Sequence, residues 1–123
     1  MHAGANLSIF NGMKRPLPVT LIGYLFIAAG AMGIIYHASE LKDIVSQPEI
    51  ILVLVVRLLA ILGGVFILRG ANWARWLVVT WIVYHVALSF AHSTAELAMH
   101  VVITLFVLIA LFNKNANRYF EIR

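Results

Sequence analysis

The sequence predicts an all-α, polytopic integral membrane protein whose four transmembrane helices form a bundle, and three observations support this class. Of the 123 residues, 63% are hydrophobic and only 11% are charged, whereas soluble domains have roughly 25% charged residues. Four apolar runs each approach the roughly 20 residues that cross a bilayer. Each run is continuous and longer than the roughly 10 residues of a barrel strand, so helices are expected.

The four expected spans are residues 19–38, 50–68, 73–91 and 95–112. Two prolines precede the first span, where a missing backbone N–H costs a helix little. Its Ala29, Gly30 and Gly33, like Gly64 in the second span, are small residues that allow close helix contact. Ser93 or Thr94 is the expected N-cap of the fourth span.

Basic residues near span ends predict the orientation, because they resist crossing the membrane during insertion. One side is expected to hold Lys14, Arg15, Arg69, Arg75, Lys114, Arg118 and Arg123, and the other side only Lys42. We therefore expect residues 1–18 to be a cytoplasmic N-terminal arm and residues 113–123 a cytoplasmic C-terminal tail. The predicted location is a bacterial inner membrane, with the 39–49 and 92–95 loops facing outward.

Composition limits the chemistry. The chain has no cysteine, which excludes structural disulfides and thiolate metal sites. The net charge of +4 reflects membrane topology, so no nucleic-acid partner is expected and the main partner is the lipid bilayer. Trp73, Trp76 and Arg75 are interpreted as anchors at the inner membrane interface. The basic C-terminal tail is expected to contact anionic lipid.

Ionisable side chains gather in the outer half of the expected bundle. At 1.5 Å per residue, Arg57 and His85 lie roughly 10 Å and His100 roughly 8 Å below the outer edge. Tyr36, His37 and Glu40 lie at the outer end of the first span. Ionisable residues within a membrane usually face the protein interior or a cavity.

Helical phase suggests that these residues share one pocket, because residues four apart lie on one helix face. Glu96, His100 and Thr104 line up on the fourth span, and Trp81, His85, Ser89 and His92 on the third. We expect an outward-facing pocket of Arg57, His85, His92, Glu96 and His100, with Tyr36, His37 and Glu40 over it. Structural readings stay open: Arg57 can snorkel to the headgroups, and His92 and Glu96 can serve only the turn. His85 and His100 can each form a hydrogen bond with a neighbouring carbonyl or hydroxyl and need no ligand.

The first functional hypothesis is a binding protein for a transition metal or haem. Neutral imidazole is the usual nitrogen ligand, and two histidines on facing helices can hold a b-type haem. His85 and His100 are the expected haem ligands, and His92, Glu96 and His100 an alternative set for a divalent metal. The spacing matches no strong metal motif.

Two other hypotheses belong to different classes. One is transport or sensing of a small anion or protons, with Arg57 attracting the ligand. The chain is similar to small multidrug transporters in its length and four spans, but its first span has no membrane-embedded glutamate, so that function is not carried over. The other is a ligand-free accessory subunit, with a homodimer or a larger membrane complex as its assembly. No set of nucleophile, base and orienting group indicates an enzyme.

Overall fold

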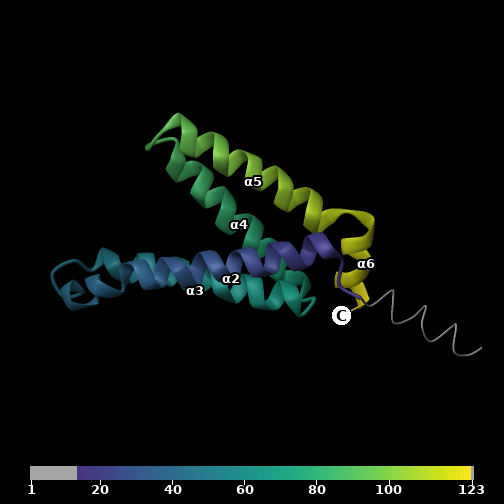
Figure 1. The fold of residues 1–123 in the computed structure, drawn as a ribbon, viewed down its shortest axis with the longest axis horizontal. Helices are drawn as coiled ribbons and strands as arrows, with labels where there is room; N and C mark the ends of the chain where they lie inside the picture. Colours follow the sequence, from purple (N-terminus) through teal and green to yellow (C-terminus); the bar gives the residue numbers. More distant parts are fainter. Residues whose placement is uncertain (1–13, 123) are drawn as a thin grey trace, which may run out of the picture.

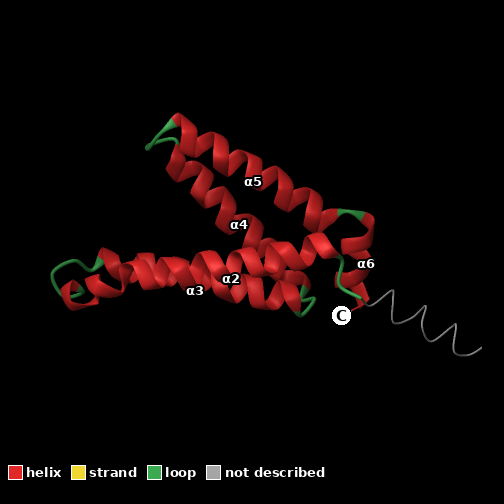
Figure 2. Cartoon of the chain, in the orientation of Figure 1, coloured by secondary structure: helices red, strands yellow, loops and turns green. Residues whose placement is uncertain are grey.

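The computed structural model describes residues 14–122, and this part of the chain is all-helical, without a strand. Its elements are α2 (Leu17–His37), the short 3-10 helix η1 (Ala38–Asp43), α3 (Glu49–Leu68), α4 (Asn72–Ser89), α5 (Thr94–Phe112) and α6 (Lys114–Ile122) (Figure 1). Figure 2 shows how short the loops between them are. The predicted all-α class is confirmed. Most of the expected N-terminal arm lies outside the described residues.

Within residues 14–122, three helices are long and apolar enough to cross a membrane, and they correspond to three of the four predicted spans. They are Leu17–Asp43, which joins α2 and η1, Glu49–Leu68 and Thr94–Phe112. The chain therefore has the helices of a membrane protein. α4 has 18 residues but is less apolar, since it includes Asn72, Arg75 and His85.

α2 and α3 form a hairpin in which backbone packs against backbone. A Cβ atom added to Gly64 of α3 would lie 2.5 Å from the carbonyl oxygen of Gly23 in α2. A Cβ atom added to Gly30 of α2 would lie 2.6 Å from the carbonyl oxygen of Arg57. Glycine at these positions is what permits such a close approach, as expected for small residues between membrane helices.

α4 and α5 form the second hairpin, joined by a turn at residues 90–93. Ser93 is the N-cap of α5, as the sequence predicted, and its Oγ accepts a hydrogen bond from the Glu96 N–H at 3.1 Å. In Figure 1 the two hairpins meet near α6 and diverge toward η1 and the 90–93 turn. We call the end beside α6 the closed end, and the end with η1 and the 90–93 turn the open end.

The hydrophobic core lies mainly toward the closed end and includes residues of α6. Its buried members toward this end include Val19, Ile22, Ile67, Ala74, Val78, Val107, Leu111, Ala116, Tyr119 and Phe120. The last three belong to α6, and the Tyr119 hydroxyl donates a hydrogen bond to the Leu68 carbonyl at 2.7 Å. The C-terminal segment is therefore a helix docked on the bundle, where the sequence suggested only a basic tail.

Arg75 holds α6 to the closed end. Its side chain is buried, with 8% exposure, and Nη1 donates to the Leu111 carbonyl at 3.0 Å and to Asn117 Oδ1 at 2.7 Å. Its Cζ lies 4.7 Å from the ring centroids of both Phe112 and Phe120. The interpretation of Arg75 as an interface anchor is wrong, because the docked α6 covers it and supplies its partners.

Candidate functional site

A cleft of about 340 Å³ lies between the two hairpins, and all four long helices contribute to its wall. Its lining residues are Leu25, Phe26 and Ala29 of α2, Arg57 of α3, Trp81, Ile82 and His85 of α4, and Glu96, Met99, His100 and Ile103 of α5. The structure thus brings Arg57, His85, Glu96 and His100 to one cavity. Depth and helical phase predicted a pocket of these four residues and His92, and His92 is not among the lining residues.

Trp81 connects the walls of the cleft. Its indole Nε1 donates to the Val56 carbonyl of α3 at 2.8 Å, and its ring meets Phe26 of α2 edge to face, with centroids 5.2 Å apart. Its other contact is with His85, one turn later on α4, with stacked rings whose centroids are 3.8 Å apart. These contacts fix the His85 ring against a rigid aromatic wall.

Hydrogen bonds determine which nitrogen of each cleft histidine is available. His85 Nδ1 lies 3.0 Å from the Trp81 carbonyl oxygen, which can only accept, so Nδ1 donates. The buried Ser89 hydroxyl donates its one proton to the His85 carbonyl at 2.8 Å, so His100 Nδ1 donates to Ser89 Oγ across 2.7 Å. Each ring thereby keeps Nε2 without a hydrogen-bond partner among the described residues.

Arg57 is the chemically conspicuous residue of the cleft. In the part of the chain that the structure describes, its guanidinium has no hydrogen bond or ion pair, and its Nε is buried from solvent without a partner. The side chain crosses Gly33 of α2, where an added Cβ would lie 2.5 Å from both Cδ and Nε of Arg57. A buried polar group normally has a partner, so this guanidinium is suited to a ligand with acceptor oxygens.

Glu96 lies at the rim of the cleft and already has a partner. Its Oε2 is 3.0 Å from Nδ1 of His92, which is 69% exposed and is not among the lining residues. Glu96 forms no ion pair with Arg57 within the described residues, although both line the same cavity. The charge of the cleft is therefore positive in its depth and negative at its rim.

The residues expected to cover the pocket lie elsewhere. His37 pairs with Glu40 at the end of α2, with 3.0 Å between Nδ1 and Oε2, and the Tyr36 ring packs on His37. Neither Tyr36 nor His37 lines the cleft. Figure 1 shows the reason, because the η1 loop and the 90–93 turn end the two diverging hairpins.

No metal centre is evident in residues 14–122, where no group of three or more histidine, cysteine, aspartate or glutamate side chains is placed to hold a metal ion. The His85 and His100 rings have centroids 5.9 Å apart and are tilted by 50°. His92 is not among the lining residues and pairs with Glu96 at the rim of the cleft.

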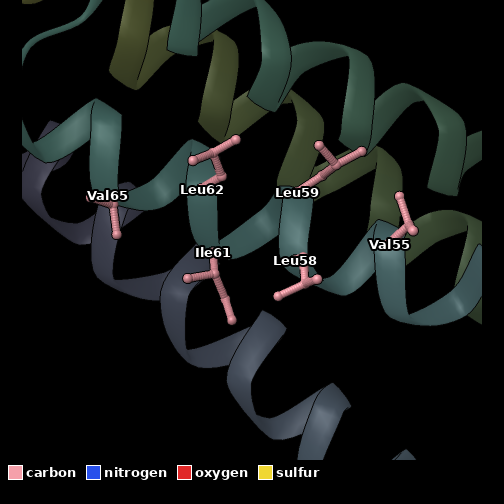
Figure 3. Close-up of a pocket in the computed structure, with 6 residues that line it drawn as sticks. All are labelled: Val55, Leu58, Leu59, Ile61, Leu62 and Val65. Atoms are coloured by element: carbon pink, nitrogen blue, oxygen red, sulfur yellow. The ribbon is translucent and has the colours of Figure 1, made fainter. Parts of the chain in front are cut away.

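A second hollow, of about 370 Å³, lies along α3 (Figure 3). Its lining residues are all apolar: Val55, Leu58, Leu59, Ile61, Leu62 and Val65. It offers no polar or titratable group to a ligand, and such a surface is what a membrane helix presents to lipid.

Comparison with known proteins adds no assignment. No protein-family model, curated protein or solved structure matches the chain. The function is therefore argued from the cleft itself.

Sequence reasoning placed Trp81 on the helix face of His85 but missed the apolar wall and the contacts of Trp81 with Phe26 and Val56. Met99 and Ile103 are one turn apart on the face of α5 that holds His100 and Glu96, but apolar residues of a membrane helix are indistinguishable from lipid-facing ones in sequence. Trp81 stands four residues before His85, and that spacing was the available signal for their contact.

Proposed function

We propose that this protein is a membrane-embedded binding protein for an oxyanion, carboxylate or phosphate, held at Arg57 in the cleft between the hairpins. The observation that carries the proposal is the buried Arg57 Nε without a partner. A guanidinium recognises planar oxyanions through paired hydrogen bonds. An arginine left unpaired inside a bundle is costly, so a ligand that completes its hydrogen bonds explains its place.

His85 and His100 would serve the same ligand. With Nδ1 of each ring donating inward to Trp81 or Ser89, each Nε2 is left to face a bound molecule. A neutral Nε2 accepts a hydrogen bond from a protonated oxygen, and a charged imidazolium donates one to an oxyanion. The two histidines would thus allow the cleft to bind a protonated ligand as well as an ionised one.

The proposal includes four spans, with both termini on the cytoplasmic side of a bacterial inner membrane. α4 supports the fourth span, since its 18 residues rise about 27 Å and it runs between the ends of α3 and α5, which are long enough to cross. Its most polar membrane-depth side chains have protein surroundings, because Arg75 is buried under α6 and His85 lines the cleft. The closed end holds Lys14, Arg15, Arg69, Lys114 and Arg118, as cytoplasmic ends do.

The alternatives have less support from the geometry. A haem or divalent metal at His85 and His100 remains a prediction. The two Nε2 atoms suit the axial positions of a haem, whereas for a divalent metal the described residues supply no third ligand. A ligand-free accessory subunit, alone or in a homodimer or larger complex, does not by itself explain why the buried Nε of Arg57 has no hydrogen-bond partner.

The test is anion-dependent stabilisation in a neutral detergent. Two hydrogen bonds to a charged group, at about 1.5–3 kcal/mol each, correspond to a Kd on the order of 1 mM. Phosphate and sulfate at tens of millimolar, compared with chloride at equal ionic strength, should raise the unfolding midpoint of the wild type. Arg57→Gln should abolish the shift, and Lys42→Gln, which removes one exposed charge at the open end, should retain it. Equal shifts in all three proteins would refute the proposal.

A further inference from the structure

We infer that the ligand of the cleft is an amphiphile, an oxyanion head group on an apolar chain, which enters from the bilayer. The inference rests on the proposed function and adds the ligand class and its route. Three independent features carry it: the apolar wall of the cleft, the depth of Arg57 and the acidic surface of the open end.

The wall beside Arg57 is suited to a hydrocarbon chain. Leu25, Phe26, Ala29, Ile82, Met99 and Ile103 surround the few polar groups of the cleft. The cavity of about 340 Å³ holds on the order of ten non-hydrogen groups, if each takes about 30 Å³ as a water molecule does. It would therefore enclose the head group and the first carbons of a chain, and the rest of the chain would remain in lipid.

The depth of Arg57 in the bilayer suits an amphiphile dissolved in the membrane better than an anion that arrives from water. Arg57 stands eight residues after Glu49, the first residue of α3, which places it about 12 Å along the helix from the open end. This exceeds the roughly 5–8 Å thickness of one interfacial layer of a bilayer. A head group bound there has its chain beside the acyl chains of the membrane.

The open end would repel free anions. Its charged residues are the carboxylates of Glu40, Asp43, Glu49 and Glu96 and the single cation of Lys42. A negative field at the mouth of a site lowers the local concentration and the association rate of anions from water. An anion that arrives laterally, between the diverging hairpins, avoids this barrier.

The experiment measures binding through Trp81, which lines the cleft. Trp73→Phe with Trp76→Phe leaves Trp81 as the reporter, and both replacements keep an aromatic ring beside Phe66 and Phe112. This protein, in phosphatidylcholine nanodiscs, is titrated with dodecyl phosphate and, separately, with inorganic phosphate. Arg57→Gln in the same background corrects for partition of dodecyl phosphate into the lipid.

We expect saturable, Arg57-dependent quenching with a half-saturating total concentration at least tenfold lower for dodecyl phosphate than for inorganic phosphate. Ala29→Phe, which fills the apolar wall, should weaken the binding of dodecyl phosphate at least tenfold, and by a larger factor than the binding of inorganic phosphate. Ala28→Phe changes the exposed neighbouring residue, which does not line the cleft, and should change the affinity for neither phosphate. Asp43→Asn with Glu49→Gln, which removes two carboxylates from the open end, should raise the affinity for inorganic phosphate. The affinity for dodecyl phosphate should stay unchanged.

The outcomes separate the two proposals. If inorganic phosphate binds as tightly as dodecyl phosphate, the inference of an amphiphilic ligand is wrong, whereas the proposal of an oxyanion site at Arg57 is retained. Dodecyl phosphate binding that Ala29→Phe does not weaken would likewise overturn the amphiphile. Binding of neither probe, or quenching that is identical in Arg57→Gln, would overturn both.

Discussion

Replacing Arg75 with methionine should release α6 from the closed end. Two hydrogen bonds from Nη1, to the Leu111 carbonyl and to Asn117 Oδ1, join α4 to the end of α5 and to α6. At about 1.5–3 kcal/mol for each bond to a charged group, reduced by desolvation of the guanidinium, the expected loss is about 3 kcal/mol. Stacking on Phe112 and Phe120 adds about 0.5–1 kcal/mol for each ring.

The assay combines thermal unfolding in detergent with chymotrypsin digestion. Tyr119 and Phe120 are buried, with 4% and 2% exposure, so the protease should cut at α6 only when the helix undocks. Arg75→Met should lower the unfolding midpoint and speed this cleavage, and Arg75→Lys should have an intermediate effect because a lysine is not planar and stacks less well. Arg118→Gln, at an exposed position of α6, is the control. If Arg75→Met resists chymotrypsin as well as the wild type does, the reasoning is refuted.

The remaining predictions concern stability and the cleft. Gly64→Ala should cost about 1–3 kcal/mol by unfolding, because the new Cβ meets the Gly23 backbone. Gly33→Ala meets only the flexible Arg57 side chain, so it should weaken the phosphate-induced shift with little loss of stability, and an unchanged shift would contradict this. Ser89→Ala leaves His100 Nδ1 unpaired and should cost about 1–3 kcal/mol; a midpoint equal to that of the wild type would disprove that role.

The sequence was informative wherever a long apolar run or a four-residue spacing carried the signal. Three predicted spans are confirmed as helices long and apolar enough to cross a membrane. Spacing on single helices, together with depth, grouped Arg57, His85, His92, Glu96 and His100. The structure brings all of them except His92 to one cleft. The cap at Ser93 followed from the preference of serine for that position.

Features that depend on how helices are tilted or docked could not be predicted. Depth along a helix placed Tyr36 and His37 at the outer end of the first span, over the pocket, but the hairpins diverge toward that end (Figure 1). α6 is short and polar on average, but Ala116, Tyr119 and Phe120 follow the i, i+3, i+4 spacing of an amphipathic helix, a local signal that sequence reasoning did not use. The burial of Arg75 beneath this helix depends on tertiary contacts between α4 and α6, which local patterns do not record. Secondary-structure signals do not include interhelical geometry.

The central claim is that Arg57 is unpaired for the sake of a ligand, and the stability of Arg57→Met without added anion tests it most directly. A buried, unsatisfied polar group costs about 1–3 kcal/mol, and methionine fills similar space without a charge. The account predicts that ligand-free Arg57→Met unfolds at a higher temperature than the wild type and loses the phosphate-induced shift. A lower midpoint for Arg57→Met in ligand-free buffer would show that Arg57 stabilises the fold and would contradict the claim.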